Sequence, residues 1–95
     1  MNVELTETSI VRLPSGVRLK KDEVRDRFVL LAPERAVILD PIAVAILNEI
    51  DGVKTFDVII KSLAAKFAAD PQAIAGDVRN FLLDLSNRRM LEFKS

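Results

Sequence analysis

The feature that most constrains the fold is a change of hydrophobic period at Asp40-Pro41. Before this dipeptide apolar residues alternate or run together in short segments, which indicates strands; after it they recur every three to four residues, which indicates helices. An aspartate that can cap a helix, followed by proline at the first helical position, is itself a strong helix start. The sequence therefore predicts an α+β domain in which a small sheet precedes a group of helices.

The N-terminal half predicts a three-stranded antiparallel sheet, with strands over residues 17–21, 27–32 and 35–39. The first strand alternates apolar and basic residues, whereas the other two are apolar on both faces. The connections are short, and the second contains Pro33, so a meander is favoured. Residues 1–16 are interpreted as an N-terminal arm, and residues 17–95 as a single domain.

The C-terminal half predicts a three-helix bundle, with helices over residues 41–51, 56–68 and 71–87. Asp40, Thr55 and Asp70 are the expected N-caps, because each precedes an apolar pattern of helical period. Gly52 is the expected C-terminal cap of the first helix. The tail beyond residue 87 carries three apolar residues and is expected to close onto the core as a strand or coil.

Composition excludes several kinds of function. The 95 residues contain 14 Lys plus Arg and 14 Asp plus Glu, with no His and no Cys. Metal sites and nucleophilic or histidine catalysis therefore lack their usual side chains, so no metal, cofactor or enzymatic activity is expected. A net charge of zero disfavours nucleic acid as a partner. No apolar run could span a membrane, and an N-terminus without basic residues is no signal peptide, so a cytoplasmic protein is expected.

Two strands that are apolar on both faces need cover on both faces, and one helical layer supplies only one. One interpretation is that the arm folds over the second face with its apolar residues Val3, Leu5, Ile10, Val11 and Leu13. Another is that a binding partner covers it, since large exposed apolar patches mark interaction sites. A third is a paired or swapped dimer through the last strand, so a monomer or a weak dimer is expected.

The third helix has an unusual outer face. Leu83 lies opposite the core stripe, together with Gln72, Gly76 and Arg79. Glycine in mid-helix costs about 0.5–1 kcal/mol relative to alanine, so either it is a tolerated surface residue or another backbone approaches closely. The second interpretation predicts a shallow groove with Gly76 as its floor, Leu83 as an apolar contact and Arg79 as a charge for an acidic group.

An unpaired strand beside such a helix describes a clamp for an extended peptide, which adds to the strand edge through main-chain hydrogen bonds. Two alternatives from other classes stay open. One is a winged-helix DNA-binding regulator, which the balanced charges on the third helix disfavour. The other is a structural dimerisation domain that uses the two-sided strands.

The chain also resembles the pyrroloquinoline quinone (PQQ) biosynthesis protein D family over about residues 12–91. The most specific segment is Leu30-Leu31-Ala32-Pro33-Glu34-Arg35 ahead of a helical half. The other matching segments are Arg12-Leu13-Pro14, Gly16-Val17-Arg18-Leu19, Val24-Arg25, Leu39-Asp40, Ile46-Leu47, Asp51-Gly52 with Thr55, Asp77-Val78, Phe81-Leu82 and Leu85. Arg89 departs from the pattern, since relatives often carry glycine there.

The resemblance implies a winged-helix-like peptide recognition domain, a RiPP recognition element. Such proteins are chaperones that hold the ribosomally made PQQ precursor peptide and present it to a partner radical S-adenosylmethionine (SAM) enzyme. In this family the peptide lies between the third strand and the third helix. Carried over to this chain, the implied peptide-binding residues are Arg35, Ala36, Val37, Ile38 and Leu39 on the strand, and Gln72, Gly76, Arg79 and Leu83 on the helix.

Overall fold

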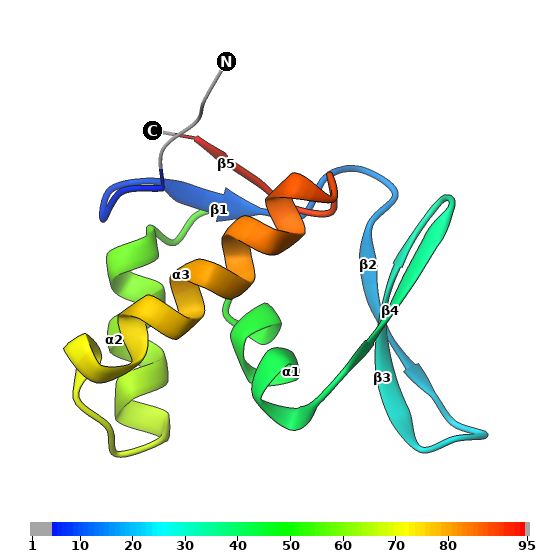
Figure 1. Ribbon diagram of the computed structural model, residues 1–95, viewed down its shortest axis with the longest axis horizontal. Helices are drawn as coiled ribbons and strands as arrows, with labels where there is room; N and C mark the ends of the chain where they lie inside the picture. The colour runs from blue at the N-terminus through cyan, green and yellow to red at the C-terminus, as the bar shows by residue number, and fades with distance from the viewer. Residues whose placement is uncertain (1–4, 95) are drawn as a thin grey trace.

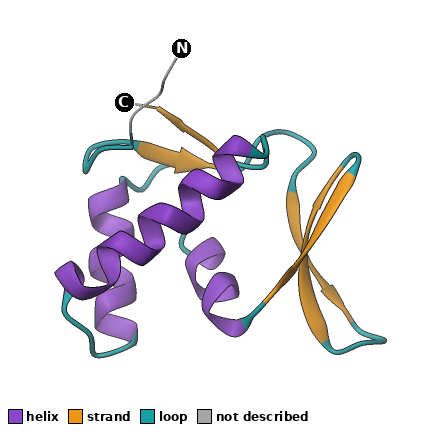
Figure 2. Ribbon diagram, viewed as in Figure 1, coloured by secondary structure: helices purple, strands orange, loops and turns teal. Residues whose placement is uncertain are grey.

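The computed structural model describes residues 5–94 (Figures 1 and 2). Its elements, in chain order, are β1 (Ile10–Arg12), β2 (Arg18–Asp22), β3 (Arg27–Ala32), β4 (Arg35–Leu39), α1 (Pro41–Asn48), α2 (Phe56–Lys66), α3 (Pro71–Asn87) and β5 (Glu92–Lys94). The three predicted strands and three predicted helices are all present. The expected order of one sheet followed by helices is not confirmed, because the first and last strands of the described residues, β1 and β5, form a second, two-stranded sheet.

The second sheet pairs β1 with β5 in antiparallel register, and Val11 lies opposite Phe93. Val11 is fully buried, and Leu5 ahead of the strand is almost so. The arm interpretation of residues 1–16 is therefore wrong for residues 5–12, which belong to the folded domain. Because these residues pack in the core, they do not cover the three-stranded sheet. Val3, which the arm interpretation also named, lies outside the described residues.

The three-stranded sheet has the order β2-β3-β4 and stands beside the helices, to which β4 leads directly through α1 (Figure 1). Its register places Leu19, Leu30 and Val37 in one cross-strand row. The next row consists of Lys20, Val29 and Ile38 and projects to the opposite face. Leu30 is fully buried, whereas Ile38 is 62% exposed. One face of the sheet therefore joins the core, and the other is uncovered in the described chain.

The helix starts follow the predicted caps. The carboxylate of Asp40 accepts a hydrogen bond from the Ala43 amide at 2.7 Å, and Thr55 and Asp70 cap α2 and α3 in the same manner. The first helix is shorter than predicted, because α1 ends at Asn48 with Glu49 as its C-cap. The assignment of Gly52 as this cap is wrong: Gly52 lies in the following loop with a φ of 80°.

The core lies between the two sheets and the three helices. The inner face of α3, the strands β1 and β5, the helices α1 and α2, and the inner face of the three-stranded sheet all contribute to it. Its fully buried side chains include Leu30, Ile59, Leu63, Leu82, Leu85, Met90 and Leu91. The tail reaches this core by a turn at Arg89, whose φ of 61° is in the left-handed region that glycine favours. The departure from glycine at this position therefore leaves the turn intact. None of the helices within residues 5–94 combines the length and apolar character needed to cross a membrane.

One charged side chain lies inside this core. Glu49 is 3% exposed, and its carboxylate forms ion pairs with Lys66 at the end of α2 and, at 3.0 Å, with Lys54 in the preceding loop. The hydrogen bond from Lys66, together with those from Ser62 and Lys54, outweighs burial and lowers the pKa of Glu49 from 4.5 to about 2. Glu49, at the end of α1, is therefore tied by ion pairs to both ends of α2.

Candidate functional site

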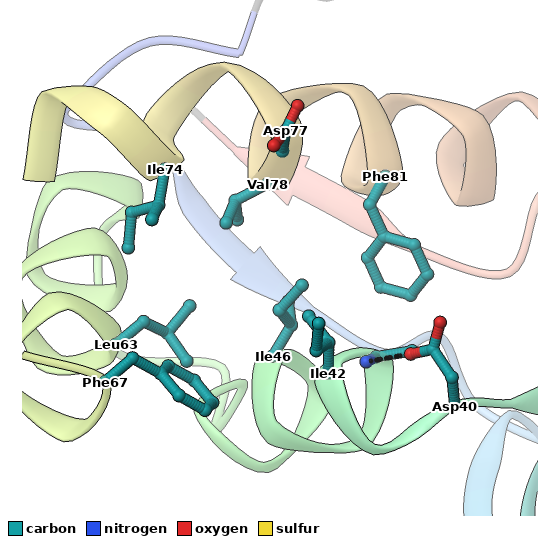
Figure 3. Close-up of a pocket in the computed structure, with 10 residues that line it drawn as sticks. Asp40, Ile42, Ile46, Leu63, Phe67, Ile74, Asp77, Val78 and Phe81 are labelled. Carbon is teal, nitrogen blue, oxygen red and sulfur yellow. Dashed lines mark hydrogen bonds between the residues drawn. The ribbon is translucent and has the colours of Figure 1, made fainter. Parts of the chain in front are cut away.

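A pocket of about 460 Å³ opens between the three helices, next to the point where β4 ends (Figure 3). Its walls are almost entirely apolar. The residues that line it are Asp40, Ile42, Ala43, Ile46, Leu63, Phe67, Ile74, Asp77, Val78 and Phe81. In Figure 3, Ile74 and Phe81 point from α3 into the pocket, Ile74 on the side of Leu63 and Phe67 and Phe81 on the side of α1.

Two of the apolar side chains at this pocket are exposed to an unusual degree. Ile42 on α1 is 64% exposed, and Phe67 just after α2 is 52% exposed. Both side chains fall on the apolar stripes of their helical segments, a pattern that predicts burial, so their exposure is not what periodicity alone indicates. Large apolar side chains around an open concavity are the usual walls of a binding site, because a ligand that covers them gains hydrophobic free energy.

The two polar residues of the pocket are both acidic. Asp40 uses Oδ1 to cap α1, and Asp77 lies on α3 across the opening (Figure 3). Within residues 5–94, neither carboxylate forms an ion pair with Lys or Arg. Nor does any group of three acidic side chains in this range lie close enough together to hold a metal ion. The pocket is therefore an apolar cavity with a negative rim.

The strand β4 forms one edge of its sheet, and among the described residues it pairs with β3 alone. In an antiparallel ladder every second residue of an edge strand directs its N–H and C=O away from its neighbour. Ala36 and Ile38 are exposed here, Val37 is half-buried and Leu39 is buried. At the other end of the strand, the guanidinium of Arg35 donates to the carbonyl of Arg88 at the C-cap of α3, at 3.4 Å. The free edge thus begins near the end of α3 and ends at the pocket.

The four helix residues implied by the resemblance lie on a different side of α3. At 100° per residue, Gln72, Gly76, Arg79 and Leu83 share one face, and the pocket-lining Ile74, Asp77 and Phe81 share the opposite one. Arg79 donates to the carbonyl of Leu5 and stands over the ring of Phe56, 4.9 Å from its centroid. Leu83 packs against the core, while Gln72 and Gly76 are exposed. None of the nine implied residues lines the pocket: β4 ends beside it at Leu39, and the four helix residues lie on the other side of α3.

The surroundings of Gly76 show whether another backbone approaches this face of α3 closely. A Cβ built on it meets no atom within 4 Å, so nothing in the described chain requires glycine at this position. We expect Gly76→Ala to raise the free energy of unfolding by about 0.5–1 kcal/mol, through helix propensity alone. Urea denaturation of the two proteins would measure it. A loss of stability would mean that a close neighbour occupies this side of α3 after all.

The sequence contained no specific signal for the pocket walls. Ile74 and Phe81 belong to the same apolar stripe on α3 as the buried Val78, Leu82 and Leu85, and the stripe has the width usual for a helix that packs on a core. Periodicity separates apolar from polar faces, but it does not distinguish a core contact from the wall of an open cavity.

Comparisons with known proteins agree with each other. The family described as coenzyme PQQ synthesis protein D (PqqD) matches residues 27–91. A PqqA binding protein of Rhizobium meliloti is 51% identical over 88 residues, which are 93% of this chain and 90% of the relative. The bifunctional coenzyme PQQ synthesis protein C/D of Methylorubrum extorquens is 46% identical over 90% of this chain and only 23% of its own length.

Two solved structures are similar in fold and sequence. The solution structure of the PqqD part of Methylobacterium extorquens PqqCD, described as a functional and stand-alone RiPP recognition element, has a TM-score of 0.80. It is 44% identical and covers 94% of this chain and 95% of that one. The crystal structure of PqqD from Xanthomonas campestris, also 44% identical, has a TM-score of 0.58 over 84% of this chain and 89% of that one.

Proposed function

The chain belongs to the coenzyme PQQ synthesis protein D family, and from this premise we propose that it binds a PqqA precursor peptide as a chaperone in PQQ biosynthesis. Relatives that cover nearly all of the chain are PqqA binding proteins. The observation that carries the proposal is the position of an open apolar pocket at the end of an unpaired strand edge. Binding and holding a peptide need no catalytic group, and we propose none.

The two parts of the site do different work. The edge of β4, from Arg35 to Leu39, would pair with the main chain of an extended peptide, which gives affinity with little demand on sequence. The pocket would take an apolar side chain of the peptide. Full burial of such a side chain is worth about 1.5–3 kcal/mol, or roughly 10- to 150-fold in affinity, so specificity would come from the pocket.

We expect Ile74→Asp to weaken binding of the PqqA peptide at least about tenfold, because it places a carboxylate on the apolar wall. Isothermal titration calorimetry measures the dissociation constant, and circular dichroism checks that the helices persist. Ile74 is only partly buried, so the fold should survive the change.

The matched control lies on the other side of the same helix. Gly76→Leu adds an apolar side chain at an exposed position away from the pocket. If Ile74→Asp binds normally and Gly76→Leu does not, the peptide contacts the face of Gln72, Gly76, Arg79 and Leu83 that the resemblance implied. If only Ile74→Asp loses affinity, the pocket face of α3 is the binding face.

We further propose that the bound peptide is presented to a radical SAM enzyme in the cytoplasm. The family resemblance supports this partner, and the fusion of a related domain in a protein C/D supports close association with other enzymes of the pathway. Co-purification of the enzyme with the chain, in the presence and absence of PqqA, would test it. Retention of the peptide without the enzyme would leave the chain a peptide binder outside such a complex.

A dimerisation role is the second candidate, because the outer face of the three-stranded sheet exposes Ile38 and half-exposes Val29. Light scattering at rising concentration would detect the weak dimer that this face permits. The DNA-binding alternative has no comparable support. Two of the arginines on α3 and its cap are already engaged: Arg79 with Leu5 and Phe56, and Arg88 with Asp84 at 3.4 Å.

A further inference from the structure

We propose that the pocket selects a peptide segment in which an apolar side chain and a Lys or Arg stand two residues apart. The apolar side chain would enter between α1 and α3, and the cation would lie at the rim against one of its two carboxylates, Asp40 or Asp77. This inference rests on the proposed function, since it names the chemistry of the ligand that the same site would accept.

The charge of the rim carries the argument. Among residues 5–94, Asp40 and Asp77 are the only polar residues that line the pocket, and the rest of its wall is apolar. Both are exposed, and neither has a cationic partner within the described chain. Oδ2 of Asp40 is left for a ligand, because the cap uses Oδ1. A cationic side chain of the peptide could pair with either carboxylate, and an anionic one would be repelled by both.

The lysines near this part of the chain do not neutralise the rim. Lys66, at the end of α2 just before Phe67, is engaged by Glu49, and so is Lys54. Arg35, at the far end of β4, reaches the carbonyl of Arg88. The negative charge at the pocket is therefore not cancelled by its neighbours. A peptide that covers the apolar wall would lower the local dielectric, which strengthens the attraction between these carboxylates and a cation.

The spacing follows from the binding mode. In an extended strand alternate side chains project to the same side, about 6.6 Å apart. A peptide that pairs with β4 and continues past Asp40 would thus direct residues i and i+2 toward the helices. One of them can fill the pocket while the other reaches its rim.

The test is a set of double-mutant cycles between the chain and the PqqA peptide. Each Lys or Arg of the peptide is replaced singly by Gln, and binding is measured by calorimetry to the wild type, to Asp77→Asn and to Asp40→Asn. Asparagine keeps the N-cap at position 40, so α1 is preserved. Asp57→Asn, which removes the same charge from α2 outside the pocket, is the control.

We expect one peptide substitution, two residues from an apolar residue, to weaken binding to the wild type about two- to fivefold. The same substitution should have little further effect with one of the two variants Asp77→Asn and Asp40→Asn, whichever lacks the carboxylate that the cation contacts, and its full effect with Asp57→Asn. Equal losses with all four proteins would overturn the inference while leaving the peptide site in place. Failure of the wild type to bind PqqA would instead overturn the proposed function, and this inference with it.

Discussion

Replacing Val11 with aspartate should unfold the domain, at a cost of more than about 4 kcal/mol, which approaches the whole stability of a small domain. Val11 is fully buried in β1, opposite Phe93 of β5. An aspartate there must either be buried without a partner for its charge or break the β1–β5 pairing. Urea denaturation followed by circular dichroism would show the loss.

The matched control is the next residue of the same strand. Arg12 is exposed and pairs with Glu92 at 2.6 Å, and an exposed ion pair contributes at most about 1 kcal/mol. We therefore expect Arg12→Ala to be nearly neutral. Native-like stability of Val11→Asp would restore the interpretation of residues 1–16 as an arm that the domain does not need.

The second large effect concerns Glu49. Its pKa of about 2 in the folded protein, against 4.5 for an unperturbed glutamate, corresponds to about 3 kcal/mol of stability at neutral pH. Glu49→Gln should lower the free energy of unfolding by about this amount, because the amide cannot replace the charge that Lys54 and Lys66 face.

The pH dependence gives a sharper test of the same residue. Because the folded pKa is lowered, this stabilisation is fully present above about pH 4.5 and is lost as the pH falls toward 2. The difference in stability between the wild type and Glu49→Gln should shrink over this interval. Asp57→Asn, which breaks an exposed pair with Lys61, should run nearly parallel to the wild type. A constant difference between the wild type and Glu49→Gln from pH 7 to 2.5 would contradict the role of the ion pairs.

The parts of the fold that local sequence determines were the parts that could be predicted. Asp40, Thr55 and Asp70 accept hydrogen bonds from amides two or three residues ahead, so each helix start depends on neighbours in the chain alone. The meander is also local, since a two-residue turn joins β3 to β4. Alternation and turn residues are sufficient to recognise such a hairpin.

The parts that depend on distant residues could not be predicted. β1 and β5 are three residues long and about eighty residues apart, so neither has a periodic signal that identifies its partner. The same holds for the site. Asp40 and Asp77 line the same pocket because of the way α3 lies across α1. Arg79 is engaged because the carbonyl of Leu5, distant in sequence, lies within its reach. The sequence gives the side-chain types at the site, but it does not give their tertiary arrangement.

The pairing of Ile10 with Lys94 brings the first and last strands of the described residues side by side. A short linker could therefore join the two ends of the domain, and the chain could be reopened in the β2–β3 turn, where Val24 is 91% exposed, without cutting the site. A circularly permuted protein of this kind should still fold. A second domain attached before β1 or after β5 would leave the described residues on the same side of the molecule, and the protein C/D relative carries two activities on one polypeptide.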